Sequence, residues 1–582
     1  MANSLSPGED AARLRWILPS HDTASAERLA AALQVDRLAA RVLVSRGLAD
    51  PQTAAHFLAD GLLDLPDPFL MRGMRPAVDR LVRAVKQREL VTLYGDYDVD
   101  GVCSTALMSL FLEECGARVA TSIPHRIRDG YGLNRAAAER IAQDGTAVLV
   151  TLDCGITAAA EVGRARDLGL DVVVVDHHTV PALLPPAVAV LNPHQPGCGY
   201  PTRHLCAAGV AFTLCMALRK ALREAGHFGQ RPEPNLKALL DLVALATVAD
   251  VVPLTGVNRV LVKHGLLALG RAGRPGIRAL KEAAGLLPEA PVTSGLVGFR
   301  LGPRINAAGR LDDAALGLKL LRAKSLEEAR PLAHALDVAN QERQLIEHRI
   351  LGAALAQAEG QGVARGLVLW GEDWHAGVVG IVAARVVERL HRPTVVVAVE
   401  AGQGKGSARS IEGFHLVEAL DGCAEFLIRY GGHRAAAGVT VEQQQLPAFR
   451  EAFGRMAAQV LSLEDLEPRC RVDVVVEPRE LTEAAVEGLS VLGPFGQGNP
   501  EPVLAARGLR ARSRVLESKR GGAGHLKLSL PEAPRLDAIG FGMAERASET
   551  DGPVDLAFQA TVDEYRGQRR VALKLKDLRA AS

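Results

Sequence analysis

Between residues 76 and 265, short runs of β-branched residues alternate with longer stretches rich in alanine and leucine. The runs are ELVTLY (89–94), AVLVTL (147–152), DVVVVD (171–176) and AVAVLN (187–192). Strands separated by segments long enough for a helix pair in parallel, with the helices packed against the sheet. The pattern therefore predicts an α/β domain built on a doubly wound parallel sheet.

The whole chain has 582 residues, which is long enough for about three or four domains. Ser325 and Glu328 form a capping-box pattern that opens a long connecting helix with apolar residues at three- and four-residue steps. After Pro468 the pattern alternates and is rich in turns, which indicates a β-barrel of the OB type. We divide the chain into an N-terminal accessory segment (1–75), the first α/β domain (76–265), a helical connector (266–365), a smaller α/β domain (366–462) and the barrel (466–580).

The composition excludes several classes of protein. The eight cysteines include no Cys-x-x-Cys pair, so neither a zinc ribbon nor a disulfide framework is indicated, and we expect reduced, mostly buried thiols. The N-terminus lacks a signal-peptide pattern and no apolar run approaches a membrane span, so we expect a soluble, cytoplasmic protein. Because the net charge is only +1, any nucleic-acid surface must be a local basic patch.

Acidic residues and histidines follow three of the predicted strands. GDYDVDG (95–101) brings Asp96, Asp98 and Asp100 to the end of the first strand, LDCG (152–155) brings Asp153 to the second, and the third ends in Asp176, His177 and His178. A lone loop of this kind is often only a solvated turn. Three successive strands that deliver such groups to one sheet edge favour a ligand site instead.

A further acid, Asp250, follows a mostly apolar helix, where an unpaired carboxylate is costly to bury. Carboxylates with imidazoles and without thiolates favour Mg²⁺ or Mn²⁺. Two such ions that share one carboxylate promote in-line displacement at phosphorus. Phosphodiester hydrolysis is the reaction that this pattern predicts.

These motifs, with ATVADVVPL (246–254), occur in the order and spacing of the DHH phosphoesterases, and the chain is most similar to the single-strand exonucleases of that family. The resemblance continues through further motifs and covers about residues 80–580. They are GPRINAAGRL (302–311), DWHAGVVGI (373–381), GSARS (406–410), GGHRAAAG (431–438) and GPFGQGNPEP (493–502).

The resemblance implies a residue-by-residue assignment of the metal site. Asp98, Asp153, His177 and Asp250 would hold one metal ion, and Asp96 and Asp153 a second, with Asp153 as the bridge. The catalytic candidates are His178, which would face the scissile phosphate, Asp176, which would orient the imidazoles, and Asp100, whose position need not be acidic in the family.

The resemblance also implies that the smaller α/β domain is a DHHA1 domain that closes over DNA and holds its terminal phosphate. Ser407 and Arg409 lie in a glycine-rich stretch suited to an anion, although GQGKGS (402–407) lacks the order of a P-loop, so we exclude nucleoside-triphosphate hydrolysis. Further substrate-binding candidates are Gly431, Gly432, His433, Arg126, Arg304 and Arg310. Without the resemblance, the glycines could mark a tight turn and the arginines could be surface residues.

We therefore expect a 5′ to 3′ exonuclease that hydrolyses single-stranded DNA to mononucleotides in DNA repair and recombination, with two Mn²⁺ or Mg²⁺ ions. The resemblance implies a monomer that works with single-strand-binding protein and a RecQ-type helicase, away from membranes. The barrel would bind DNA through charge, since it has few aromatic residues, and we expect a chain ended near Pro468 to keep hydrolysing short oligonucleotides. Its basic residues are Arg507, Arg510, Arg512, Arg514, Lys519, Arg520 and Lys527.

Two other readings remain open at this point. One is a shorter type of DHH enzyme, an oligoribonuclease or cyclic-dinucleotide phosphodiesterase, against which the C-terminal barrel argues. The other is a DNA-binding scaffold without catalysis, since one eukaryotic replicative-helicase subunit keeps this fold while losing metal ligands. Every expected ligand position is filled in this chain, which favours the enzyme.

Overall fold

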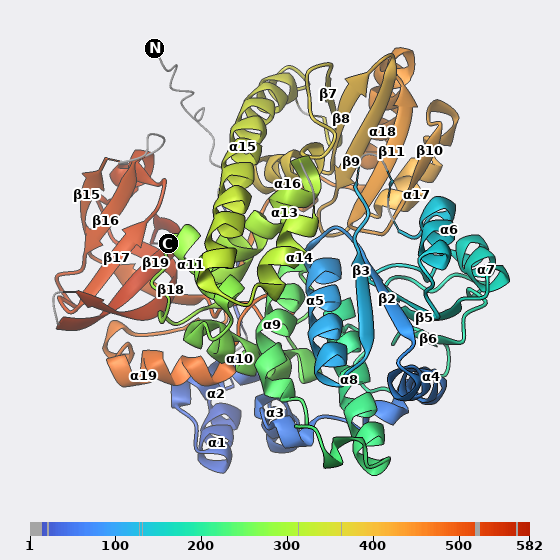
Figure 1. Ribbon diagram of the computed structural model, residues 1–582. Coiled ribbons are helices and arrows are strands. Elements are labelled where there is room, and N and C mark those ends of the chain that lie inside the picture. The colour runs from blue at the N-terminus through green and yellow to red at the C-terminus, as the bar shows by residue number, and fades with distance from the viewer. Residues whose placement is uncertain are drawn as a thin grey trace. The chain divides into compact units, whose positions relative to one another are not determined.

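The structure is a computed structural model that describes residues 14–581 except 20–21, 127–128, 131, 312–313, 363, 518–523 and 566–567 (Figure 1). The chain divides into two compact units, and each is discontinuous in sequence. One unit holds residues 59–343 and 493–500, and we call it the catalytic unit because the residues expected to carry the reaction lie in it. The second unit holds residues 1–58, 344–492 and 501–582. Lys519 and Arg520 of the expected basic group lie outside the described residues.

A five-stranded parallel sheet forms the centre of the catalytic unit, with the strand order β3-β2-β4-β5-β6. The strands are β2 (Leu90–Gly95), β3 (Arg118–Ser122), β4 (Val148–Leu152), β5 (Asp171–Val175) and β6 (Ala189–Leu191). The predicted doubly wound parallel sheet is confirmed. The edge strand β3 was not among the runs identified from the sequence.

Both faces of this sheet are buried. Along β4, Val148 and Val150 pack into one apolar core, while Leu149 between them packs into another. Because successive side chains of a strand point to opposite faces, a β4 sequence that is apolar except for Thr151 is what a sheet covered on both sides requires. The covering helices are α4 (Met74–Gln87), α5 (Val99–Glu114), α8 (Ala207–Glu224) and α9 (Leu240–Ala249) in the first core, and α6 (Arg135–Gln143) and α7 (Ala159–Asp167) in the second.

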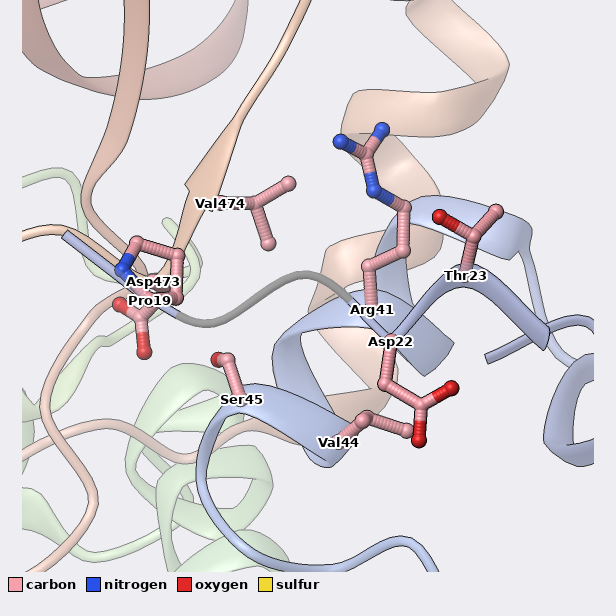
Figure 2. Close-up of a pocket in the computed structure, with 8 residues that line it drawn as sticks. All are labelled: Pro19, Asp22, Thr23, Arg41, Val44, Ser45, Asp473 and Val474. Atoms are coloured by element: carbon pink, nitrogen blue, oxygen red, sulfur yellow. The ribbon is translucent and has the colours of Figure 1, made fainter. Parts of the chain in front are cut away.

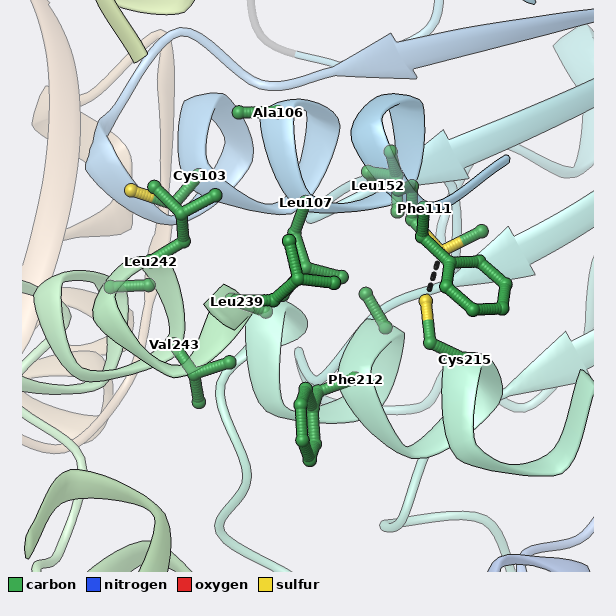
Figure 3. Close-up of a cluster of buried hydrophobic side chains, with 14 of the residues drawn as sticks. Cys103, Ala106, Leu107, Phe111, Leu152, Phe212, Cys215, Leu239, Leu242 and Val243 are labelled. Atoms are coloured by element: carbon green, nitrogen blue, oxygen red, sulfur yellow. Dashed lines mark hydrogen bonds between the residues drawn. The ribbon is translucent and has the colours of Figure 1, made fainter. Parts of the chain in front are cut away.

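The first core is centred on α5. Figure 3 shows Leu107 and Phe111 of α5 packed with Phe212 of α8 and Val243 of α9. The Cys215 thiol lies 3.4 Å from the sulfur of Met108. All eight cysteines are free thiols and seven are buried, as expected.

The connector region is helical and ends in the expected long helix, α15 (Leu326–Glu359). Its start is capped, because the backbone N–H of Glu328 donates to Ser325 Oγ at 3.2 Å and Glu328 Oε2 accepts from the backbone of Lys324 at 2.9 Å. The boundary between the two units, at residues 343 and 344, falls inside this helix. The preceding helices are α10 (Gly256–Arg271), α11 (Pro275–Ala283), α12 (Ser294–Leu296), α13 (Gly302–Leu311) and α14 (Ala315–Arg322).

The smaller α/β domain, in the second unit, has a mixed five-stranded sheet of order β10-β11-β9-β8-β7. Its strands are β7 (Leu367–Gly371), β8 (Thr394–Glu400), β9 (Gln403–Arg409), β10 (Arg429–Gly432) and β11 (Ala436–Glu442). Its helices are α16 (Val379–Leu390), α17 (Leu416–Asp421) and α18 (Leu446–Val460). The aromatic rings of Phe414, Phe449 and Phe453 pack in its core.

The C-terminal region forms a seven-stranded sheet of order β13-β14-β18-β19-β17-β16-β15. The strands are β13 (Val474–Val475), β14 (Leu504–Leu509), β15 (Arg512–Leu516), β16 (His525–Ser529), β17 (Leu536–Gly540), β18 (Val554–Tyr565) and β19 (Gln568–Ala580), and the short helix α19 (Glu483–Gly488) precedes β14. β18 and β19 pair antiparallel along their whole lengths. This is the all-β C-terminal domain that the alternating pattern predicted.

The N-terminal residues pack with the C-terminal sheet rather than forming a separate domain. β1 (Arg15–Ile17) pairs in parallel with β12 (Arg469–Arg471). Trp16 donates from its ring to Asp577 at 2.6 Å, and the guanidinium of Arg579 lies 4.3 Å from the centre of a Trp16 ring. Three helices follow, α1 (Thr23–Leu33), α2 (Arg37–Ser45) and α3 (Pro51–Leu58).

A small pocket lies in this N-terminal region of the second unit. Figure 2 shows Arg41 and Ser45 of α2, Asp22 before α1 and Asp473 before β13 around it. Arg46, the next residue of α2, forms an ion pair with Asp473 at 2.8 Å. The pocket therefore marks the packing of the N-terminal helices on the start of the C-terminal sheet. Among the helices that the structure describes, none has both the length and the apolar character needed to cross a membrane.

Candidate metal centre

The centre lies just beyond the carboxyl ends of three parallel strands in the catalytic unit. The backbone of Asp96, after β2, donates to Leu152 at 3.1 Å, and that of Asp153, after β4, donates to Val175 at 3.0 Å. These bonds extend the ladder one residue past each strand end, so the acidic residues emerge side by side. This is the sheet edge at which α/β proteins bind their ligands.

His177 lies close to three carboxylates of the site. Its Nε2 atom lies 3.1 Å from Oδ1 of Asp153, 3.6 Å from Oδ2 of Asp250 and 3.7 Å from Oδ2 of Asp100. A second group joins Asp153 to Asp96 and Asp98, whose ligand atoms lie within 4.8 Å of one another. The structure thus brings together the five predicted metal ligands, with Asp153 common to both groups.

The chemistry of these side chains fits a divalent cation. Three buried atoms, Asp96 Oδ1, His177 Nε2 and Asp250 Oδ2, have no hydrogen-bond partner within the described parts of the chain. Buried polar atoms are nearly always satisfied, so three unsatisfied atoms within these two groups of potential ligands indicate a missing partner. A cation with oxygen and imidazole ligands is a partner that would satisfy all three.

The electrostatics lead to the same conclusion. Burial, together with the negative charge of Asp98, raises the pKa of Asp96 well above its usual value. Burial and the charges of Asp100 and Asp98 raise the pKa of Asp250 to about 9. Burial and the neighbouring carboxylates likewise raise the pKa of Asp153. Burial and the proximity of His178 lower the pKa of His177 to about 4, so its ring is neutral at pH 7, as a metal ligand must be.

Two tight backbone features place the carboxylates. Asp153 has a φ of 65°, in the left-handed region, which is uncommon for a residue other than glycine. At the start of α5, a Cβ on Gly101 would lie 2.4 Å from the backbone oxygen of Asp96. Only glycine permits that approach. Asp98 also caps the helix, because its carboxylate accepts from the backbone N–H of Asp100 at 2.9 Å and of Gly101 at 3.1 Å.

Asp176 holds both histidines of the triplet. One of its oxygens accepts from the backbone of His177 at 2.7 Å and of His178 at 3.1 Å, and it lies 2.7 Å from Nδ1 of His178. Burial opposes a charged imidazole, yet the hydrogen bond and charge of Asp176 raise the pKa of His178 to about 9. Asp176 therefore orients His178 and keeps it protonated.

Asp100 has a different environment from the other acids. It is only 1% exposed, and its two oxygens accept from the backbones of Ala207 at 2.6 Å and Ala208 at 2.8 Å, at the start of α8. Burial and the charge of Asp98 raise its pKa to about 7. This geometry ties the start of α8 to the metal centre, where Asp100 is grouped with His177 and Asp250.

A cavity of about 290 Å³ opens beside the centre. Arg126 and Arg310, two predicted substrate-binding residues, line it. The guanidinium of Arg126 lies 4.8 Å from the centre of the Tyr97 ring. The third candidate, Arg304, is instead bound by Asp337, whose Oδ1 lies 2.9 Å from its guanidinium. The other lining residues are Asp96, Tyr97, Asp98, Ala249, Asn306 and Gly309.

Tyr97 and Asn306 were not identified from the sequence. Asn306 accepts from the backbone of Val99 at 3.1 Å and so ties α13 to the start of α5. Both residues lie inside motifs that were recognised, GDYDVDG and GPRINAAGRL, and that location was the available signal.

The remaining substrate-binding candidates lie in the second unit, on adjacent strands. Ser407 of β9 pairs with Gly438 of β11, which in turn pairs with Gly431 of β10. A Cβ on Gly380, at the start of α16, would lie 3.2 Å from Ser407 Oγ and 3.4 Å from the guanidinium of Arg409. Gly431, Gly432 and His433 are exposed beside this group. The result is one compact surface that combines a hydroxyl, a guanidinium and glycine backbone.

Comparison with known proteins agrees with this arrangement. A protein from Dickeya dadantii, named "Single-stranded-DNA-specific exonuclease RecJ", is 41% identical over 559 residues, which are 92% of this chain and 95% of that one. The crystal structure of RecJ from Thermus thermophilus in complex with Mn²⁺ has a TM-score of 0.82 at 32% identity and covers 98% of this chain and 80% of that chain. The Mg²⁺ complex of the same protein has a TM-score of 0.77 at 31% identity and covers 98% and 79%.

Three family models match successive parts of the chain: "DHH family, N-terminal domain" over residues 90–247, "DHHA1 domain" over 361–459 and "RecJ OB domain" over 472–577. The parallel sheet, with carboxylates and a His–His pair at its edge, defines a phosphoesterase of the DHH class. More narrowly, the chain belongs to the RecJ family. The predicted resemblance and the OB-type C-terminal domain are thereby confirmed.

Proposed function

We propose that the protein is a metal-dependent exonuclease that hydrolyses single-stranded DNA from its 5′ end and releases mononucleotides. The observation that carries the proposal is the convergence of Asp96, Asp98, Asp153, His177 and Asp250 on one sheet edge, where three buried ligand atoms lack protein partners. Two Mn²⁺ or Mg²⁺ ions held there would activate water and neutralise charge on the scissile phosphate. The names of the relatives, which specify single-stranded DNA, support the substrate class.

His178 is the side chain best placed to act on the substrate. Its ring is 37% exposed, while Asp176 fixes its orientation. With a pKa of about 9, it carries a proton at pH 7 and can donate a hydrogen bond to the phosphate or to the departing oxygen. Arg126 and Arg310, which line the adjoining cavity, add positive charge where the phosphate backbone would lie.

The preference for a 5′ end is proposed to come from the DHHA1 domain. Ser407 and Arg409 would bind the terminal phosphate, and the exposed backbone of Gly431 and Gly432 with His433 would contact the DNA. A guanidinium suits this role because it forms paired hydrogen bonds to phosphate. Burial lowers the pKa of the Arg409 guanidinium, and none of the described acidic groups raises it.

The C-terminal sheet is proposed to bind the strand upstream of the reaction. Arg507, Arg510, Arg512 and Arg514 are exposed, the last two on β15. Exposed cations bind the phosphate backbone without regard to sequence. Lys527, on the neighbouring strand, is partly neutralised by Asp537 at 3.4 Å.

The proposed cellular role is DNA repair and recombination in the cytoplasm. The protein would act as a monomer, with single-strand-binding protein and a RecQ-type helicase as partners. Family membership supports this part of the proposal.

A release assay tests the activity. Single strands labelled at the 5′ or the 3′ end are incubated with the full chain and Mn²⁺, and products are resolved over time. Early release of labelled mononucleotide from the 5′-labelled strand alone is the expected result. Early release from the 3′-labelled strand, cleavage of dinucleotides only, or no cleavage with intact binding would overturn it.

A further inference from the structure

Residues 493–500, the first part of the GPFGQGNPEP motif, are a C-terminal segment that belongs to the catalytic unit. The residues on either side of it, up to 492 and from 501, belong to the other unit. The segment forms a closed turn, because Gly496 and Asn499 exchange backbone hydrogen bonds of 2.8 and 3.2 Å. The buried side chain of Asn499 donates to the carbonyl of Pro494 at 2.9 Å and braces the same turn.

This turn contacts the loop that follows Asp250. The backbone N–H of Leu254 donates to the carbonyl of Gln497 at 2.8 Å. A Cβ on Gly496 would lie 2.7 Å from the Leu254 side chain, and one on Gly498 would lie 2.9 Å from Cβ of Pro253. The two glycines therefore allow the backbones to approach more closely than other residues would permit.

The loop after Asp250 needs such support. Asp250 ends α9, and the next residue, Val251, has a φ of 57° although it is β-branched. A β-branched residue keeps this conformation only where its surroundings enforce it. One constraint is Asn258, whose amide donates to Pro253 at 3.0 Å. The Gln497 carbonyl provides another on the next residue.

We propose that residues 493–500 are a positioning element of the metal centre, which keeps the carboxylate of Asp250 directed at His177. The inference rests on the proposed function, because it assumes that Asp250 binds metal.

The test compares two substitutions in the full-length protein. Gly498→Ala places a methyl group against Pro253 at a φ of 71°, whereas Gly145→Ala, at a φ of 78° before β4, meets nothing within 4 Å. Both substitutions place alanine at a positive φ, which disfavours it, but only in Gly498→Ala does the new methyl group contact the loop after Asp250. Mn²⁺ binding is measured by calorimetry without DNA, and turnover is measured against Mn²⁺ and against single-stranded DNA.

We expect Gly498→Ala to raise the Mn²⁺ dissociation constant by about 10-fold or more, as loss of a group that orients a ligand typically does. Gly145→Ala should bind like the wild type. The turnover of Gly498→Ala should recover at high Mn²⁺, with its KM for DNA unchanged. Equal Mn²⁺ affinity in Gly498→Ala and wild type would overturn the inference, whereas absence of Mn²⁺ binding by the wild type would overturn the proposed function instead.

A second variant covers the case in which Gly498→Ala does not fold. In Gly496→Ala the new methyl group meets the far end of the Leu254 side chain, which can move. A smaller rise in the Mn²⁺ dissociation constant is expected, and wild-type affinity in this folded variant would overturn the inference. Hydrogen exchange gives the reciprocal readout, because a turn that favours metal binding must itself be stabilised by Mn²⁺.

Discussion

Nδ1 of His178 lies 2.7 Å from Oδ1 of Asp176, and that carboxylate also accepts the backbone N–H groups of both histidines in the triplet. Its other oxygen accepts from Ile156 at 3.0 Å, so the carboxylate is held at both ends. This fixes the orientation of the His178 ring. The first and third residues of the DHH triplet therefore act as a pair, while His177 between them faces the carboxylates.

Replacing Asp176 by asparagine should shift the pH dependence of turnover. The pKa of His178 is about 9 mainly because Asp176 opposes the effect of burial, so loss of the charge should lower it. If the protonated ring assists the reaction, the alkaline decline in kcat should begin at a lower pH in Asp176→Asn than in the wild type. The profile of the exposed variant Asp144→Asn is the control. An unchanged alkaline limb would exclude a protonated His178 from the rate-limiting step.

Asp153→Asn should abolish hydrolysis while the protein stays folded. Asparagine suits the test better than alanine, because it tolerates the left-handed φ of 65° at this position. Loss of a bridging carboxylate affects both proposed ions, and an effect of several kcal/mol corresponds to roughly a thousand-fold in turnover. Steady-state rates in saturating Mn²⁺, with circular dichroism for folding, check it. Near-normal turnover would refute the bridging role.

The stability of the metal-free protein should fall as the pH rises. The folded-state pKa values of Asp96, Asp153 and Asp250 lie above the value of about 3.9 for an unfolded aspartate, so protonation favours the folded state. The contribution of Asp250 is complete below about pH 4 and is lost as the pH rises through about 9, its pKa in the folded state. In EDTA, the decrease in Tm between these limits should be smaller for Asp250→Asn than for the wild type.

Added Mn²⁺ should reverse this loss. Because the metal replaces protons on the same carboxylates, the increase in Tm that it produces should grow with pH. Equal metal-induced shifts at low and high pH, or identical pH dependence for Asp250→Asn and wild type in EDTA, would show that these carboxylates do not govern the effect.

Arg409→Ala should remove most of any preference for 5′-phosphorylated over 5′-hydroxyl single strands. A charge-assisted hydrogen bond is typically worth about 1.5 to 3 kcal/mol, or roughly 10- to 100-fold in kcat/KM. Arg389→Ala is the matched control, since Arg389 is exposed in the last turn of α16 whereas Gly380, beside Arg409, is at its start. A preference that survives in Arg409→Ala would assign the phosphate to another group.

Substitution of both Arg512 and Arg514 by glutamine should weaken binding of long single strands. Each lost phosphate contact reduces the salt dependence of log affinity by about 0.7, so the double variant should lose up to about 1.4 from the slope. Turnover of short oligonucleotides at saturating concentration should persist. A salt slope equal to that of the wild type would indicate a structural or partner-binding role for β15.

The sheet and the metal centre could be predicted from the sequence because both depend on local patterns. The apolar run in β4 marks a strand buried on both faces, and Asp153 follows it directly. The edge strand β3 could not be predicted, because its residues are not fully buried and include Arg118, Thr121 and Ser122. No apolar run therefore marks it in the sequence. The charge of Arg304 gave no indication that Asp337 would neutralise it.

Contacts between segments that are distant in sequence could not be predicted from such local patterns. The pairing of Trp16 with Cys470, and the hydrogen bond from Leu254 to Gln497, join residues separated by hundreds of positions without a periodic signal. Recognition of the GPFGQGNPEP motif showed that the segment matters but not what it touches. The hydrogen bonds of Asp100 likewise could not be predicted, because its partners are the backbone amides of Ala207 and Ala208.

Because each unit is discontinuous in sequence, some of its contacts can form only late in translation. During translation, β1 must wait for residue 471 to leave the ribosome before its parallel partner exists, and the loop after Asp250 must wait for residue 500. Pairings over such separations are slow to form because a long segment must first be ordered. A nascent chain that already carries all five metal ligands therefore still lacks the turn that contacts the loop after one of them, Asp250.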